Sequence, residues 1–232
     1  SAIESTYPGN VIHFSEGSFD LSQAIALKPY QYLGGTYTQS TILNHLANNA
    51  LLIANDHTII EHFQVHANDK PAITIASKDN LLLSNVIINN ASIGLSVSDS
   101  NAPISFCTFY DNAIGVVLDT NAQPSLAYNI FDTTTFGIKN NTGSSISSAH
   151  NIFYNNTTPY TGAITASNDS IVSQAPLYAP ENNLFILHPT SNAINIDTNY
   201  DAGALSFYHT SASYTSTLIS NPIDRSYDTL SF

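Results

Sequence analysis

The chain has 232 residues, of which 9% are charged, and its 17 acidic and 5 basic side chains give a net charge of −12 at pH 7. This charge argues against nucleic-acid partners and anionic membrane surfaces, because both need a basic footprint. The single cysteine, Cys107, excludes a disulfide framework, and no apolar run reaches the ~18 residues that a membrane-spanning helix needs. We therefore predict no nucleic acid and no membrane insertion.

Residues 1–10 read as a short lead-in. The chain contains no methionine, so a chain that begins at Ser1 is expected to be processed or cut from something longer. Polarity comes mainly from Asn, Ser and Thr, which can stack in register where like charges would repel. This composition favours a secreted or cell-surface protein, of bacterial type.

From about residue 50 to residue 156 the sequence repeats with a step of about 22 residues. One apolar column reads Ile60, Leu82, Ile104, Leu126 and Ser148. A second, five positions on, reads Val65, Ile87, Phe109, Phe131 and Phe153. A third column is rich in amides: Phe63, Asn85, Cys107, Asn129 and Asn151.

These runs are short, alternate in polarity and contain β-branched residues, which is typical of strands. A fixed period near 22 residues that survives poor letter identity indicates a solenoid. Each coil has room for about three short strands, and no single coil can bury its apolar face alone. We expect the apolar columns to form the core and the Asn columns to satisfy backbone groups at the bends.

The pattern I-x-x-N-x-F, as in 126–131 and 82–87, is followed by a Gly-aliphatic pair. It resembles the repeat of right-handed parallel β-helix proteins of the pectate-lyase-like superfamily. Residues 11–43 look like the first coils of that fold. Residues 190–205, TSNAINIDTNYDAGAL, resemble the closing segment of many secreted bacterial members.

The resemblance implies an all-β, right-handed parallel β-helix of roughly seven to nine coils. We predict one domain over residues 1–209, with residues 176–209 as a terminal coil or cap. Residues 210–232 would form a tail that packs on the coils or links onward.

Enzymes of this superfamily carry recognisable catalytic strings, such as Gly-His-Gly or Asp-Pro-His-Glu, and none is present, so no specific enzyme family is matched. The best catalytic candidates are Asp119 and Lys139, which we expect on adjacent coils about 4.8 Å apart on the outer face. They would act as base and charge neutraliser, in either order. The alternative is a surface ion pair worth less than ~1 kcal/mol.

Acidic residues recur near one corner, and Asp56, Asp79 and Asp99 are the candidate metal ligands, with Ca²⁺ as the possible cofactor. The alternative is solvated Asp residues that favour turns. His45 and His66, with Glu61 nearby, form a second possible metal site, against which stands the commoner case of surface histidines on a strand. Cys107 stands in an amide column and is expected to be buried.

The residues beside the inward phenylalanines point outward and would form an apolar face. The candidate ligand-binding residues on it are Tyr110, Tyr128, Ile130, Ile152 and Tyr154. Tyr128 belongs to a row near a bend whose direction the sequence does not fix: His62, Ser84, Phe106, Tyr128 and His150. Three occupants are open for this face: the tail from residue 205 onward, a second subunit in a homo-oligomer, or a glycan that stacks on the rings.

These observations leave three functions open. The first is a secreted or cell-surface carbohydrate-binding or adhesive module without catalysis. The second is a polysaccharide lyase or related carbohydrate-active enzyme that acts along the coil face. The third is a structural spacer or oligomeric spike within a larger surface protein.

Overall fold

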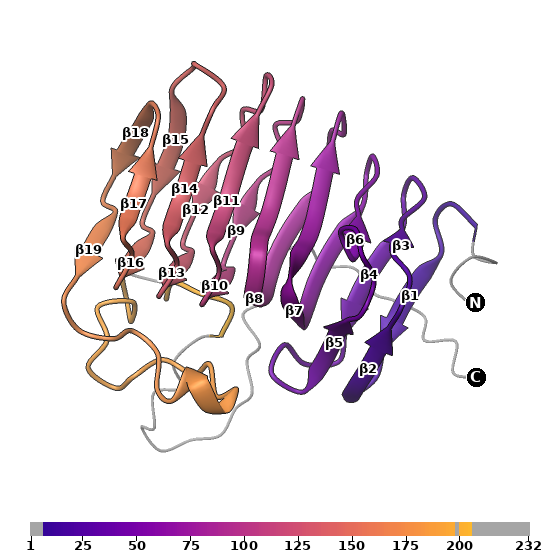
Figure 1. Cartoon of the computed structure of the whole chain (residues 1–232), viewed down its shortest axis with the longest axis horizontal. Coiled ribbons are helices and arrows are strands. Elements are labelled where there is room, and N and C mark those ends of the chain that lie inside the picture. Colours follow the sequence, from indigo (N-terminus) through magenta and orange to yellow (C-terminus); the bar gives the residue numbers. More distant parts are fainter. Residues whose placement is uncertain (1–6, 198–199, 206–232) are drawn as a thin grey trace.

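The computed structural model describes residues 7–197 and 200–205 (Figure 1). In this part of the chain, 19 strands join into one sheet that winds upon itself, and a single short 3-10 helix comes after them. The strands are β1 Val11–Phe14, β2 Gly17–Leu21, β3 Ile25–Ala26, β4 Tyr32–Gly35, β5 Thr41–His45, β6 Leu52–Ile53, β7 Ile59–Ala76, β8 Leu82–Ser98, β9 Ile104–Ser105, β10 Thr108–Tyr110, β11 Ile114–Asp119, β12 Leu126–Ala127, β13 Ile130–Asp132, β14 Phe136–Asn140, β15 Ile146–Ala149, β16 Ile152–Tyr154, β17 Thr158–Thr161, β18 Ile164–Ser167 and β19 Ser170–Val172; the helix is η1 Pro180–Asn182.

Every ladder between these strands is parallel, and each strand pairs with the strand one coil away. The stack has about 7 turns of ~22 residues. It runs from β1–β3 at one end to β17–β19 at the other (Figure 1). The predicted all-β parallel solenoid, with its coil number near seven, is therefore confirmed.

Apolar columns fill the inside of the stack, as predicted. Phe109, Phe131 and Phe153 pair in register, and their parallel rings lie 4.9 Å and 4.8 Å apart. A glycine column lies beside them. A Cβ on Gly115 would come within 2.7 Å of the Gly137 carbonyl oxygen and 2.8 Å of the Phe131 ring. Because glycine has no Cβ, these positions leave the space that the stacked phenylalanine rings occupy.

One coil departs from the uniform step that we predicted. In β8 the register pairs Ile60 with Leu83 and Val65 with Ile88, so the inward residues are one position later than Leu82 and Ile87. The next coil restores the phase, because Leu83 pairs with Ile104 and Ile88 with Phe109. One step of 23 residues followed by one of 21 leaves the average step at 22, so the repeat length does not reveal the shift. In a strand, a shift of one residue turns each side chain to the opposite face.

The same one-residue shift makes the predicted amide column wrong at Asn85, because Val86 and not Asn85 pairs with Phe63. The remaining ladder is continuous. Cys107 N donates to Asn129 Oδ1 at 2.9 Å, and Asn129 N donates to Asn151 Oδ1 at 2.8 Å. Cys107 is buried as expected, and burial raises the pKa of its thiol to about 12.

The described residues between 176 and 205, which are 176–197 and 200–205 and are here called the lateral segment, contain no strand of the parallel stack. They run along the side of the stack beneath β10, β13 and β16 (Figure 1). The backbone N–H of Phe185 donates to Gln39 Oε1 at 3.2 Å, and that of Gly203 donates to the Tyr128 carbonyl at 2.7 Å. The segment thus bridges early and late coils. The predicted tail, 210–232, lies outside the described residues.

Candidate ligand-binding cleft

The outward apolar face, whose occupant the sequence left open, is covered at Ile130 and Ile152 by the chain itself. Ile130 and Ile152 are fully buried, in one cluster with residues of the lateral segment. The covering side chains are Leu177, Phe185, Leu187, Ala193, Ala202 and Ala204. The cover that the structure describes comes from residues 177–204, and residues 206–232 lie outside the described chain. Two of the five predicted ligand-binding residues are corrected to core residues.

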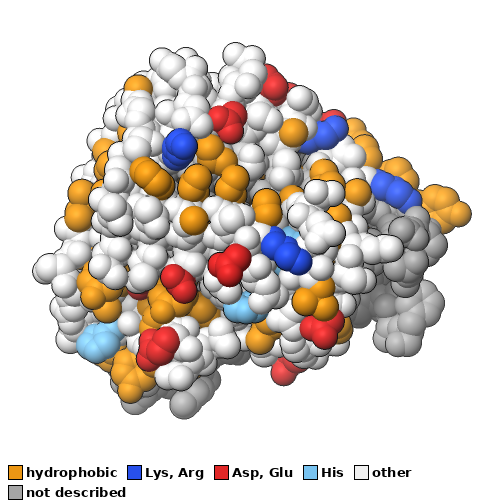
Figure 2. Space-filling view, viewed as in Figure 1, with side chains coloured by type: hydrophobic (Ala, Val, Ile, Leu, Met, Phe, Trp, Pro, Cys, Tyr) orange, Lys and Arg blue, Asp and Glu red, His pale blue; other side chains and the backbone are white. Residues whose placement is uncertain are grey.

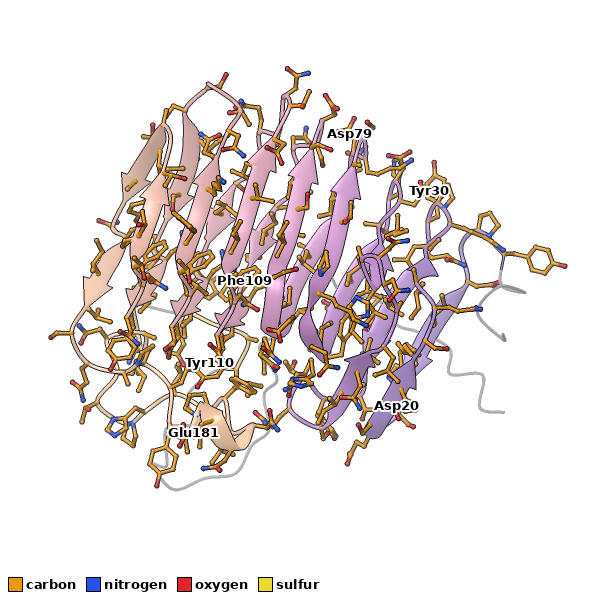
Figure 3. All side chains as sticks on the ribbon, viewed as in Figure 1. Asp20, Tyr30, Asp79, Phe109, Tyr110 and Glu181 are labelled. Atoms are coloured by element: carbon orange, nitrogen blue, oxygen red, sulfur yellow. The ribbon has the colours of Figure 1, made fainter. Side chains whose placement is uncertain are left out.

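Tyr110 and Tyr154 of this face are half-buried. The Tyr110 ring meets Phe185 edge-on at 5.5 Å, and Figure 3 shows Tyr110 beside Glu181 of η1. Between the two tyrosines in register lies Asp132, which is buried with Thr133 Oγ1 donating to it at 2.7 Å. Burial raises the pKa of Asp132 to about 6, and the nearby Asp111 charge adds to the rise.

Tyr128 has a different setting, in a column of residues that turn a corner of each coil. His62, Asn85, Phe106, Tyr128 and His150 all have positive φ, between 52° and 64°. This column contains Asn85 where the sequence row placed Ser84. A left-handed backbone suits Asn and is uncommon for bulky side chains. Three successive rings at such positions are therefore an unusual feature.

The rings of this column stack on one another. Phe106 and Tyr128 are 5.0 Å apart and almost parallel, at 4°. Tyr128 and His150 are also 5.0 Å apart, at 11°. The ring of Tyr200, in the lateral segment, is tilted against both Phe106 and Tyr128, with ring centroids 5.8 Å and 5.4 Å apart. His150 is the last ring of the column, and no further ring stacks on it within the described chain.

An open cleft of about 900 Å³ lies at this end of the column, between the last coils and the lateral segment. Its lining residues are His150, Asn168, Asp169, Ser170, Asn192, Asn195, Ile196 and Asp197. Tyr128 reaches its edge, because its hydroxyl donates to Asp197 Oδ2 at 3.1 Å. Burial, and then this bond to Asp197, raise the pKa of Tyr128. The cleft therefore joins an aromatic column to a set of amides, a hydroxyl and two carboxylates.

The predicted catalytic pair, Asp119 and Lys139, lies on the outer face of β11 and β14, but the two side chains form no ion pair. Lys139 pairs in register with Val117, two residues before Asp119. Lys139 Nζ lies 5.8 Å from the centre of the Phe136 ring, while Asp119 Oδ1 accepts a hydrogen bond from Asn141 Nδ2 at 2.7 Å. Among the described residues, the face in Figure 2 has a few separate basic side chains and no basic patch.

Two of the three predicted metal ligands, Asp56 and Asp99, have protein partners for their carboxylates. Asp56 Oδ1 accepts the backbone N–H of Asp79 at 2.9 Å, its other oxygen lies 3.9 Å from Lys78 Nζ, and Asp99 accepts from Asn121. Asp79 is exposed at the same corner (Figure 3). Across residues 7–197 and 200–205, no three His, Cys, Asp or Glu side chains converge as a metal site. The Ca²⁺ assignment stays a prediction.

The two histidines of the alternative metal site face different partners. His45 is fully buried, with Nε2 3.0 Å from the Pro71 carbonyl and Nδ1 accepting from Ala47 N. Its pKa is lowered by burial. His66 Nδ1 lies 2.6 Å from Asn89 Oδ1. His45 is therefore a satisfied core residue and not the surface strand histidine considered above.

Comparison with known proteins gives the family. The family described as "Right handed beta helix region" matches residues 32–200. The chain belongs to this family. No curated protein matches the sequence. The right-handed parallel β-helix that the sequence predicts is thereby confirmed.

Among solved structures, a point mutant of the PL6 family alginate lyase AlyGC is similar, with a TM-score of 0.49 and 15% identity. The match covers 72% of this chain and 33% of the lyase chain, so this chain spans about a third of that protein's length. At this level the likeness concerns the fold alone. No helix in the described residues is long and apolar enough to cross a membrane.

Sequence reasoning selected Tyr128 but missed the cleft beside it. Asp169, Asn192 and Asp197 come from segments outside the regular repeat, and no periodic signal brings them together. The available signal was the row of rings itself, since Phe106, Tyr128 and His150 succeed one another at steps of 22.

Proposed function

We propose that this β-helix is a secreted or cell-surface carbohydrate-binding module, without catalysis of its own, and that its ligand occupies the cleft beside His150. The observation that carries the proposal is the stacked column of Phe106, Tyr128 and His150 that ends at a polar cleft. A sugar presents an apolar ring face and a rim of hydroxyls. An aromatic edge with amide and hydroxyl neighbours offers partners for both.

The left-handed backbone recurs at corners throughout the stack and does not by itself mark a site. Phe, Tyr and His in this conformation are each held at a cost of the order of 1–2 kcal/mol, which Asn reduces. Ring stacking offsets part of this cost, by about 0.5–1.5 kcal/mol for each pair. The support for the proposal therefore comes from the stacked rings beside the cleft. The lyase alternative has less support, because Asp119 and Lys139 have separate partners.

The test is a glycan-array screen with and without Ca²⁺, followed by calorimetric titration of the best ligand. His150→Asn removes the ring at the cleft and keeps a residue that tolerates positive φ. His62→Asn is the matched control, since His62 has the same corner position but lies four coils away from His150 along the column and outside the cleft lining. We expect at least a ~10-fold loss of affinity for His150→Asn, equal to about 1.4 kcal/mol, and no loss for His62→Asn.

Two results would contradict the proposal. The first is equal loss, or no loss, in the two variants, which would move the binding surface away from the cleft. The second is a folded protein that binds no glycan and sediments as a stable oligomer, which would favour the spacer or spike.

A further inference from the structure

Asp132 is a buried carboxylate at the edge of the area that the lateral segment covers. It comes two residues after Ile130, which packs beneath the segment, and lies in register between Tyr110 and Tyr154. In the same row, Tyr110 and Val172 also pack against the cluster that contains the segment. Asp132 alternates with an inward phenylalanine and so points outward, yet it is only 2% exposed. Its burial therefore depends on what packs over this row, and the lateral segment packs there.

The hydrogen bonds of Asp132 suit an uncharged carboxyl group. Among the described residues its side chain has one donor, the hydroxyl of Thr133 at 2.7 Å. The carboxylate of Asp169, by contrast, accepts from four groups. An ionised carboxylate has about four acceptor positions, so a charge on Asp132 needs water to fill the others. A segment that stays packed over this row keeps such water out.

The charges around Asp132 act in the same direction. Burial raises the pKa of Asp132 to about 6, and the charge of Asp111 adds to the rise. Tyr110 lies beside Glu181 of η1 (Figure 3), and after burial the charges of these three acids raise the pKa of its hydroxyl. No Lys or Arg of the described chain contributes to either shift. Along the row the next base is His66 on β7, three strands before β13.

We infer that Asp132 is a pH switch for the lateral segment: the protonated carboxyl group keeps the segment packed on the coils, and ionisation loosens it. In the closed form the pKa is about 6, whereas an Asp that solvent reaches keeps the ordinary value of 3.8. The stabilisation of the closed form is therefore complete below the lower value and is lost as the pH rises to the upper one. The ratio of closed to open segment should fall by a total on the order of 100-fold.

The switch bears on ligand binding because the lateral segment forms one wall of the cleft. Asn192 and Ile196 of the segment line the cleft, and Tyr200 packs against the rings of Phe106 and Tyr128. An open segment takes this wall and this ring away from the column. For this consequence the inference rests on the proposed function: glycan affinity should fall with the fraction of closed segment as the pH rises.

The test is hydrogen exchange of the full chain, followed by mass spectrometry of its peptides, from about pH 4 to about pH 8. Asp132→Asn keeps an oxygen for Thr133 and cannot ionise, and comparison at equal pH cancels the intrinsic exchange rate. We expect the protection of residues 176–197 in the wild type, relative to Asp132→Asn, to fall at least ~10-fold over this range. Protection of β7 and β8 should not change.

Two further comparisons guard the result. Asp20→Asn removes one exposed charge at the far end of the molecule (Figure 3) and should follow the wild type. Within the wild type alone, protection of 176–197 relative to β7 and β8 should fall with pH, and this measure needs no variant to fold. Calorimetric titration with the uncharged oligosaccharide that binds most tightly on the array then follows affinity over the same pH range.

The outcomes separate the switch from the proposed function. Equal protection of the segment in the wild type and Asp132→Asn at every pH overturns the switch and leaves the proposed function standing. Loss of protection in the coils together with the segment also overturns it, because Asp132 would then act on the whole fold. A loosened segment with unchanged affinity overturns the link to the cleft. If no glycan binds at any pH, the proposed function fails, and the exchange data still decide the switch.

Discussion

Asp169 accepts the backbone N–H of Asn151 at 2.7 Å and so ends the internal amide ladder of the stack with a carboxylate. One and two coils earlier, Asn151 and Asn129 accept the corresponding N–H groups through their side-chain oxygens. At the last coil of the described chain, no further Asn continues this ladder. The carboxylate takes its place and also accepts two hydroxyl groups.

This position predicts the effect of changing Asp169. In Asp169→Ala the buried N–H and amide of Asn151 lose an acceptor, and each unsatisfied group costs about 1–3 kcal/mol. In Asp169→Asn an oxygen can still face Asn151, and the hydroxyls can turn to find other acceptors, so the loss should be under half as large. Urea unfolding monitored by circular dichroism measures both. Equal stabilities of the two variants would show that the ladder does not end here.

The ladder also shows how far sequence reasoning reaches. Asn129 and Asn151 were predictable, because they recur at a fixed step and repeat the same local contacts. Asp169 was not, since it comes 18 residues after Asn151 and breaks the step. A coil inside the stack has a similar coil on each side, so its contacts repeat. The last coil lacks one of these neighbours, and its contacts depend on residues outside the repeat.

The glycine column gives a second prediction. Gly115→Ala places a Cβ 2.7 Å from the Gly137 carbonyl oxygen and 2.8 Å from the Phe131 ring. Neither the backbone of a stacked coil nor a ring held between two other rings can move far. We expect a loss of about 1–3 kcal/mol, typical of overpacking. Thermal unfolding measures it.

Gly143→Ala is the matched control for backbone effects. Gly143 has φ of +79° with nothing within 4 Å of its ideal Cβ, so only conformational strain is introduced. We expect a loss near 1 kcal/mol there. A smaller loss at Gly115 than at Gly143 would mean that the coils separate easily to admit a methyl group.

The β8 coil shows why register is harder to predict than fold. Ile87 and Ile88 are both buried, one beneath the lateral segment and one inside the stack. A hydrophobicity pattern cannot tell these two faces apart when both are covered. Because the lateral segment covers the outer face of these strands, the outward residues are apolar as well. The alternation of apolar and polar residues that would indicate the register is therefore lost.

The lateral segment itself gives a third prediction. Phe185 is buried against Tyr110 and the isoleucine row, whereas its neighbour Leu184 is 36% exposed. Phe185→Ala should cost about 3–5 kcal/mol at the segment, and Leu184→Ala much less. Limited proteolysis should then cut within 176–205 well before the coils. Simultaneous loss of the coils and the segment would show that the segment is part of one cooperative unit with the stack.

Asp132 gives the last prediction, on pH. Its pKa is raised from 3.8 to about 6, first by burial and then by Asp111. The folded protein therefore keeps a proton on Asp132 at pH values where the unfolded chain has released it. The free energy of unfolding should fall as the pH rises between these two values and stay lower above them. The full difference is of the order of 3 kcal/mol.

The Asp132→Asn variant distinguishes the pH dependence caused by Asp132 from that caused by other carboxylates. The amide retains an oxygen for Thr133 and cannot ionise, so the variant should lack this fall and be more stable than the wild type at pH 7. Asp111→Asn, at an exposed neighbour, is the control and should change the curve only slightly. Urea midpoints across pH 4 to about 8 provide the measurement. Parallel curves for the wild type and Asp132→Asn would mean that Asp132 is already ionised beneath the lateral segment.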